Sequence, residues 1–304
     1  MSMISRLATG VLNNPIGVQL RVGAVRPAPS ARRQSFHTSP SLWLGATMVG
    51  LFLLIALVGP FVTTYAPDQV MAGARLAPPS PAFPFGTDSL GRDILSRVLY
   101  GARLAVWTML LGTSIAVVLG ILPGLVAGYR GGWIDQVLSR GMDIALAFPG
   151  MLLALIVVAR LGPSLDHAVI AMGMVSAPGF FRLVRVQTIS GRTTAYVDAA
   201  RSIGASDLRI LFRHIAPNLL SSMIVIATTR AGILLLAIGG LSFVGLGAQP
   251  PAPEWGALLA SGRGYLETAP WVVLFPGVFF ILTIVSVNLL GDGLRDALDP
   301  HARA

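Results

Sequence analysis

Residues 196–207 read YVDAARSIGASD, and the run continues over residues 208–218 as LRILFRHIAPN. Asp198 to Ile203 has the spacing of a helix, with Ala199, Ala200 and Ile203 on one side. Gly204 is the residue type that ends a helix in a left-handed conformation. Ser206 can cap a second helix that has Asp207 in its first turn. The run predicts two short amphipathic helices that meet at a bend.

A pair of short helices cannot bury its small apolar face alone. This face therefore predicts a unit that fills a groove on a soluble partner. The alternative is an interfacial helix that lies on lipid and turns its Arg side chains toward the headgroups.

The composition indicates that lipid is the solvent for most of the chain. Of 304 residues, 54% are hydrophobic and 12% are charged, whereas soluble domains have about 25% charged residues. All 22 basic residues are Arg, so the lysine of a Walker A phosphate loop is absent. With no Cys, four scattered His and only two Glu, the sequence also argues against disulfides and against a metalloenzyme site. We expect no catalytic residue, no metal and no cofactor in this chain.

Six apolar runs are long enough to cross a bilayer, which needs about 20 residues. The third contains Arg140 and Asp143, and its Phe148-Pro149-Gly150 should kink it. We expect the spans near residues 42–62, 104–128, 138–159, 168–184, 219–238 and 271–290.

The distribution of Arg predicts the orientation. If the N-terminus is cytoplasmic, fifteen Arg and six Asp lie on the inner side, while the outer basic and acidic residues cancel. The net charge of +9 is then entirely cytoplasmic, as are both termini. Because the basic residues are spread over four short segments, they do not predict a nucleic-acid surface.

Residues 1–41 contain Arg and Ser but no acidic residue. We interpret them as a disordered cytoplasmic tail, with a mitochondrial transit peptide as the alternative.

The quoted run also carries a resemblance. Asp198-Ala199-Ala200 followed by Gly204, with HIAPN at 214–218, resembles the EAA loop of permease subunits of bacterial ABC importers. The chain departs from the pattern at Asp198, where Glu is usual, and at Ala216, where Leu is usual. Four further runs resemble the C-type subunit of the dipeptide, oligopeptide and nickel permease family: FGTDSLGRD (85–93), GYRGGWID (128–135), LSFVGLGAQPPAPEWG (241–256) and GDGLRDALDP (291–300).

The resemblance covers residues 42–302 and implies an all-α, polytopic permease domain of the type I ABC importer fold, with six transmembrane helices and a cytoplasmic coupling helix. It implies peptide import across a bacterial cytoplasmic (plasma) membrane, or import of nickel or haem complexes by the same machinery. The implied partners are a second, homologous permease subunit in a heterodimer, two ATP-binding subunits or domains that hold ATP and Mg²⁺, and an extracytoplasmic solute-binding protein. The implied ATPase-coupling residues are Asp198, Ala199, Ala200, Gly204, Ala205, His214 and Pro217.

Residues 239–270 form a Pro- and Gly-rich external connection. We expect Pro250, Pro251 and Pro253 to keep it extended, and we expect Pro250, Pro251 and Trp255 to receive a binding protein or close the outer mouth. A tight turn is the alternative.

Arg230 stands 11 residues after Leu219, hence about 16 Å along the helix and near mid-bilayer. An intramembrane Arg is a functional hypothesis by default, so we expect Arg230 to line the translocation pathway and meet a peptide carboxylate. The alternative is a pair with an acid or carbonyl of the partner subunit.

A proton-coupled secondary transporter that uses Asp143 and Arg230 as a charge pair is a rival function. An intramembrane enzyme is a second rival, but no predicted span contains His and only Asp143 is acidic.

Two further patterns have structural interpretations. Gly120, Gly124 and Gly128 permit close helix approach, within this subunit or at a subunit interface. Asp292, Arg295, Asp296 and Asp299 share one helix face, where we expect internal ion pairing or, alternatively, a contact to the ATPase.

Overall fold

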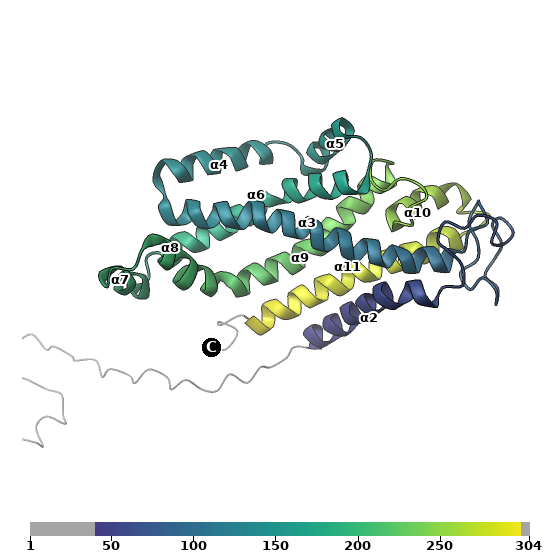
Figure 1. Cartoon of the computed structure of the whole chain (residues 1–304), viewed down its shortest axis with the longest axis horizontal. Coiled ribbons are helices and arrows are strands. Elements are labelled where there is room, and N and C mark those ends of the chain that lie inside the picture. Colours follow the sequence, from purple (N-terminus) through teal and green to yellow (C-terminus); the bar gives the residue numbers. More distant parts are fainter. Residues whose placement is uncertain (1–39, 299–304) are drawn as a thin grey trace, which may run out of the picture. The chain divides into compact units, whose positions relative to one another are not determined.

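A computed structural model describes residues 40–298 and contains no strand within them (Figure 1). Most of the predicted tail and Asp299 lie outside the described residues. The helices are α2 (Pro40–Val62), α3 (Ile94–Arg130), α4 (Gly132–Leu146), α5 (Gly150–Leu161), α6 (Leu165–Gly191), α7 (Ala195–Ser202), α8 (Asp207–Arg209), the π-helix η1 (Ile210–Ile215), α9 (Ala216–Phe243), α10 (Trp255–Gly262), the 3₁₀-helix η2 (Arg263–Tyr265) and α11 (Trp271–Leu298).

The membrane-crossing elements agree with the predicted multi-pass architecture. Five helical segments are long and apolar enough to cross a bilayer, and α4 with α5 makes a sixth if the bent pair is one span. These two helices meet at 86° across Phe148 and Pro149, where the kink is predicted. The prediction of a kink at this point is confirmed.

Several helices extend well beyond the apolar runs. Helix α3 begins at Ile94, because the Asp93 carboxylate caps it by accepting the Ser96 N–H at 2.9 Å. Helix α11 continues past the predicted end at Leu290 and carries Asp292 and Arg295. Charged residues can continue a helix once it leaves lipid, so the apolar runs mark the membrane-embedded portion and not the helix ends.

Helices α3 and α6 pack closely along the predicted glycine stripe. A Cβ at Gly120 would lie 2.5 Å from the Ala177 carbonyl oxygen, and a Cβ at Gly128 would lie 2.6 Å from that of Arg185. Gly124 meets the backbone of α6 in the same way. The stripe therefore serves packing within this subunit, which is one of the two predicted roles.

Candidate functional site

The predicted bend of the coupling segment is present. Helix α7 ends at Ser202, and Gly204 adopts a left-handed conformation with φ +79°. Ser206 occupies the N-cap position of α8, although its side chain makes no capping hydrogen bond. The prediction of a separate second short helix is wrong, because α8, η1 and α9 form one helical segment from Asp207 to Phe243. The coupling segment is thus joined rigidly to a membrane helix.

The face of α7 that the sequence assigns to a partner is divided between the interior and the surface. Val197 and Ala200 are buried in a cluster with Ile210 and Ile215 of η1. The prediction that Ala200 faces a partner is therefore wrong, because η1 covers it within this chain. Ala205 is half-buried against the same cluster. Asp198 and Ala199 remain exposed, as does Gly204.

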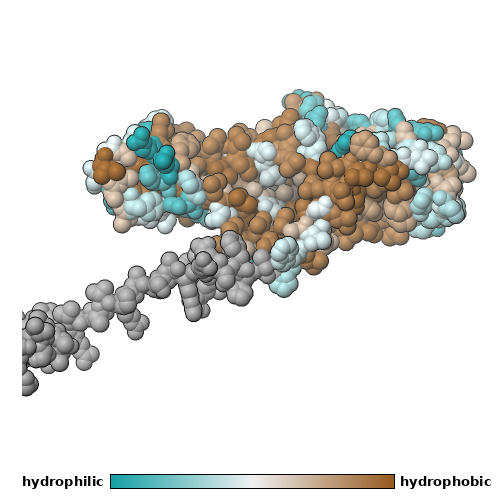
Figure 2. Space-filling view, turned by 60° about the horizontal axis from the view of Figure 1, so that its bottom comes forward, coloured by the Kyte–Doolittle hydropathy of each residue, from teal (hydrophilic) through white to brown (hydrophobic). Residues whose placement is uncertain are grey.

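Four large apolar side chains at this end of the chain face outward. Ile203 is 85% exposed and Leu208 is 64% exposed, and Phe212 and Tyr196 are also exposed. We call these four residues the coupling tip. Figure 2 shows an isolated apolar patch among hydrophilic residues at the end that carries α7 in Figure 1. Exposed apolar side chains with a charged rim are typical of a protein interface. Of these four residues, only Ile203 belongs to the apolar face that the sequence assigns to a partner.

Hydrogen bonds fix the base of the coupling tip. The Tyr129 hydroxyl donates to Asp207 Oδ1 at 2.8 Å, and Arg192 Nη1 donates to the Tyr129 carbonyl oxygen at 3.1 Å. Asn218 Nδ2 donates to the Tyr196 hydroxyl at 3.2 Å. Movement of the tip is therefore linked to the ends of both α3 and α9.

Two of the predicted coupling residues lie at the base and not on the coupling tip. His214 is half-buried in η1, and its carbonyl oxygen accepts a hydrogen bond from Asn218 at 2.8 Å. Pro217 is exposed in the first turn of α9, directly after the π-helix η1.

Helix α4 is attached to α6 largely through charged side chains. Arg182 Nη2 donates to Asp143 Oδ1 at 2.8 Å, and Arg185 pairs with Asp135. Helix α4 has no buried residue, so little apolar packing adds to these pairs. Because Asp143 pairs with Arg182, it does not form the charge pair with Arg230 that a proton-coupled transporter would use.

Arg230 lines a groove of about 510 Å³ between α6, α9 and α11. Asp292 and Arg295 of α11 line the same groove, and residues 292–298 contain no ion pair with one another. The prediction of internal ion pairing on this face is therefore wrong within the described residues. These side chains are directed to the groove and to solvent instead.

The depth of Arg230 differs from the sequence prediction. Gly291 of α11 packs against Thr229, and Gly293 packs against Leu42. Arg230 is therefore level with the first turns of α2 and not with its middle, so the predicted mid-bilayer position does not fit. The sequence interpretation takes Leu219 as the point where this helix enters the bilayer, whereas the contacts place Arg230, eleven residues later, only level with the first turns of α2.

The external connection contains a turn and a helix where the sequence predicts an extended loop. The Ala252 N–H donates to the Gln249 carbonyl oxygen at 3.1 Å and closes a turn at Pro250 and Pro251. The connection thus contains the tight turn that the sequence leaves open as the alternative to an extended loop. Trp255 is 1% exposed, and its Nε1–H donates to the Val98 carbonyl oxygen at 3.1 Å. The prediction that Trp255 receives an external partner is wrong, whereas Pro250 and Pro251 are exposed.

Glu254 caps the helix that follows this turn. Its carboxylate accepts the Gly256 N–H at 3.0 Å and the Ala257 N–H at 2.9 Å. Burial raises the pKa of Glu254 above its ordinary value, while these backbone hydrogen bonds act in the opposite direction.

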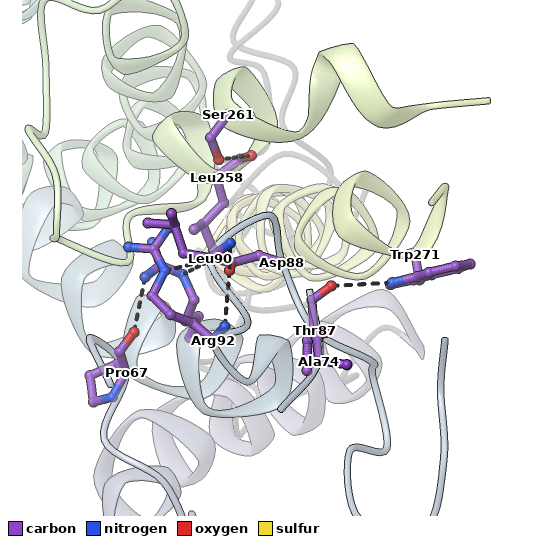
Figure 3. A network of polar contacts seen from close by, with 10 residues as sticks. Pro67, Ala74, Thr87, Asp88, Leu90, Arg92, Leu258, Ser261 and Trp271 are labelled. Atoms are coloured by element: carbon purple, nitrogen blue, oxygen red, sulfur yellow. Dashed lines mark hydrogen bonds and ion pairs between the residues drawn. The ribbon is translucent and has the colours of Figure 1, made fainter. Parts of the chain in front are cut away.

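The motif at residues 85–93 has a structural role. Asp88 Oδ1 accepts the backbone N–H groups of Leu90 and Arg92 at 2.8 and 3.0 Å, and Arg92 Nε donates to Oδ2 at 2.7 Å (Figure 3). Arg97 reaches back to the Pro67 carbonyl oxygen at 2.9 Å. These contacts fold the segment between α2 and α3 onto the start of α3.

The family assignment follows from comparison with known proteins. A family model described as "binding-protein-dependent transport system inner membrane component" matches residues 116–304. The chain belongs to this family. It is therefore a multi-pass membrane component of a transport system and not an enzyme.

The relatives are permease proteins. The dipeptide transport system permease protein DppC of Alkalihalophilus pseudofirmus is 45% identical, with 86% of each chain covered. The glutathione transport system permease protein GsiD of Pectobacterium atrosepticum is 43% identical over 85% of this chain and 88% of its own. The di/tripeptide transport system permease protein DppC of Pseudomonas aeruginosa is 43% identical over 89% and 91%.

A solved structure shares the fold. A chain of the inward-facing MetNI methionine ABC transporter matches with a TM-score of 0.55, covering 67% of this chain and 97% of that chain. At 18% identity, this likeness supports the fold alone.

Proposed function

We propose that this chain is one of two membrane subunits of an ATP-driven importer that moves di- or oligopeptides into the cell by alternating access. The coupling tip carries the proposal, because it presents exposed apolar side chains on a base that is bonded to two membrane helices. The names of the relatives support peptides over nickel or haem complexes as cargo.

The partners follow from what this chain lacks. It has no lysine for a Walker A loop, so ATP and Mg²⁺ are held by separate ATPase subunits or domains. The coupling tip fits a groove on such a partner, and a second, homologous permease subunit completes the pathway. An extracytoplasmic binding protein delivers peptide at the end where Pro250 and Pro251 are exposed.

The mechanism is mechanical, with no covalent chemistry in this chain. Closure of the ATPases on ATP displaces the coupling tip, and the continuous helical segment from Asp207 to Phe243 carries that displacement toward Arg230. The Tyr129–Asp207 hydrogen bond carries it to α3. The π-helix η1 supplies a local irregularity of the kind often found at functional sites.

The proposed orientation places the coupling tip and both termini in the cytoplasm. Single-cysteine variants test this cleanly, because the natural chain contains no Cys. An impermeant maleimide should label Arg130→Cys, at an exposed position outside the coupling tip, only in inverted vesicles. It should label Glu267→Cys only in intact cells, after the outer membrane is permeabilised if one is present. The opposite pattern would refute the orientation.

Peptide uptake tests the function and its rival together. Cells that lack this chain should fail to take up labelled trialanine, and the intact gene should restore uptake. In membrane vesicles loaded with ATP, uptake should persist when an uncoupler removes the proton gradient. Loss of uptake on uncoupling, with ATP present, would favour the proton-coupled transporter.

A further inference from the structure

The groove that contains Arg230 is a half-site, because the described chain leaves its charged side chains and Gln187 Oε1 without a partner. It lies between α6, α9 and α11 and is lined by polar as well as apolar side chains. Arg230 and Arg295 oppose the single acidic residue Asp292, so the groove carries one excess positive charge. Such a surface favours an anionic ligand.

Arg230 is available to that ligand. Among residues 40–298, no side chain or carbonyl accepts a hydrogen bond from its guanidinium, which is exposed to the groove. Gly179 of α6 faces this guanidinium, since a Cβ there would lie 3.5 Å from Arg230 Nη2, in ordinary contact. A guanidinium presents a planar fork that binds a carboxylate through two hydrogen bonds.

A second polar group in the groove needs a donor. The Gln187 side-chain oxygen Oε1 is buried and has no hydrogen-bond partner. A buried acceptor without a partner is costly, and a peptide N–H is a suitable donor for it once the Gln187 amide turns toward the groove that this residue lines. The groove thus offers a carboxylate-binding group and an acceptor for a backbone amide.

The spacing of these groups sets the size of the ligand. Gly179, against which Arg230 lies, and Gln187 are eight residues apart on α6, or about 12 Å along its axis. An extended peptide spans about 3.3 to 3.6 Å per residue, so about three residues cover this distance.

We propose that this groove is a transit subsite for short peptides, in which Arg230 binds the C-terminal carboxylate and Gln187 accepts a backbone N–H. The proposal rests on the proposed peptide transport and deepens it, because it gives this chain a selectivity of its own. A free carboxylate is bound about tenfold more tightly than a carboxamide, because the amide loses the charge-assisted pair.

Protection of a thiol from labelling tests the subsite in the assembled complex. Ser222 lines the groove, and Gly141 lies outside it in open space. In membrane vesicles that hold the complete transporter, N-ethylmaleimide labelling of Ser222→Cys should be slowed by trialanine at about one tenth of the concentration that trialanine amide requires. Labelling of Gly141→Cys should be unaffected by either peptide.

Variants of the two polar groups separate their roles. In the Ser222→Cys variant, the further substitution Arg230→Gln should abolish the preference for trialanine over its amide in the labelling assay. Arg230→Lys should keep part of that preference. Adding Gln187→Leu should weaken protection by both peptides and leave the preference intact. An unchanged preference in Arg230→Gln would overturn the proposal, as would a complex that fails to assemble, because Arg230 would then be a subunit contact.

The outcomes also separate this inference from the transport proposal. If wild-type vesicles take up trialanine but Ser222→Cys is protected equally by both peptides, transport stands and the subsite is refuted. If protection shows the carboxylate preference but no peptide is taken up, the groove binds peptides through Arg230 but is not a transit subsite, and peptide transport is refuted.

Discussion

The Tyr129 hydroxyl donates a hydrogen bond to Asp207 Oδ1 at 2.8 Å and joins the end of α3 to the start of the helical segment beneath the coupling tip. Tyr129 itself is buried, whereas Asp207 is exposed. The contact therefore lies where a displacement of the tip reaches the membrane helices. It gives the coupling segment a second attachment besides its own chain.

Removal of this hydroxyl should weaken coupling. Tyr129→Phe loses a hydrogen bond to a charged group, which we expect to contribute about 1 kcal/mol because Asp207 is exposed. Peptide uptake should fall by a few fold while the complex still assembles. Tyr265→Phe, at a hydroxyl with no hydrogen bond in the described chain, is the matched control and should retain full uptake.

The glycine stripe should determine stability. Gly124→Ala places a methyl group 2.9 Å from the Phe181 carbonyl oxygen, so α3 and α6 must separate. We expect a loss of about 1 to 3 kcal/mol, by analogy with overpacked cores. Thermal unfolding of the purified complex measures it. Gly141→Ala lies inside helix α4 and meets nothing within 4 Å, so it should keep or raise the midpoint, because alanine favours a helix interior over glycine. An equal loss in both variants would contradict the packing.

Trp255 should act through the core and not through a binding protein. Trp255→Ala leaves a cavity and removes the donor to the Val98 carbonyl oxygen, at a cost of about 3 to 5 kcal/mol. The affinity of the folded complex for its binding protein should be unchanged. Trp133→Ala, at a side chain that is 72% exposed, should have a far smaller effect on stability. A selective loss of binding-protein affinity in Trp255→Ala would restore the docking role.

Glu254 should make stability depend on pH. Burial raises its pKa in the folded state above the ordinary value of 4.5, so the folded chain holds its proton more tightly than the unfolded chain. The contribution is complete below pH 4.5 and is lost as pH rises through the folded pKa. Glu254→Gln should therefore flatten the fall in unfolding midpoint above pH 4.5. Glu267→Gln, at an exposed position, should leave that fall in place. If the midpoint of Glu254→Gln falls with pH as steeply as that of the wild type, the assignment to Glu254 is contradicted.

The sequence predicted what depends on local composition. Uncharged apolar runs located α2 and the start of α11, Phe148-Pro149-Gly150 located the break between α4 and α5, and Gly204 located the end of α7. These features follow from propensity and hydropathy over a few residues.

Features that depend on distant contacts were missed. Trp255 is buried because its indole meets the Val98 carbonyl, 157 positions earlier in the chain. Ala200 faces inward because η1 packs over it, although its helical spacing alone would suit either side. The groove around Arg230 requires three helices at a particular depth, which the length of one apolar run does not determine.

The central claim is that ATP hydrolysis by separate subunits drives this chain through the coupling tip. Ile203 is 85% exposed, so Ile203→Asp should leave folding intact but place a charge in the ATPase interface. If the ATPase buries this side chain, its loss costs about 1.5 to 3 kcal/mol of binding free energy, or at least tenfold in affinity for the ATPase. The buried charge adds a further cost. Leu266→Asp, at an exposed position between η2 and α11, is the control.

The most direct measurement is peptide-stimulated ATP hydrolysis by the reconstituted transporter that contains Ile203→Asp. We predict at least a tenfold loss of stimulation relative to the wild type, with Leu266→Asp retaining it. Stimulation equal to the wild type in an Ile203→Asp complex of unchanged subunit content would contradict the account.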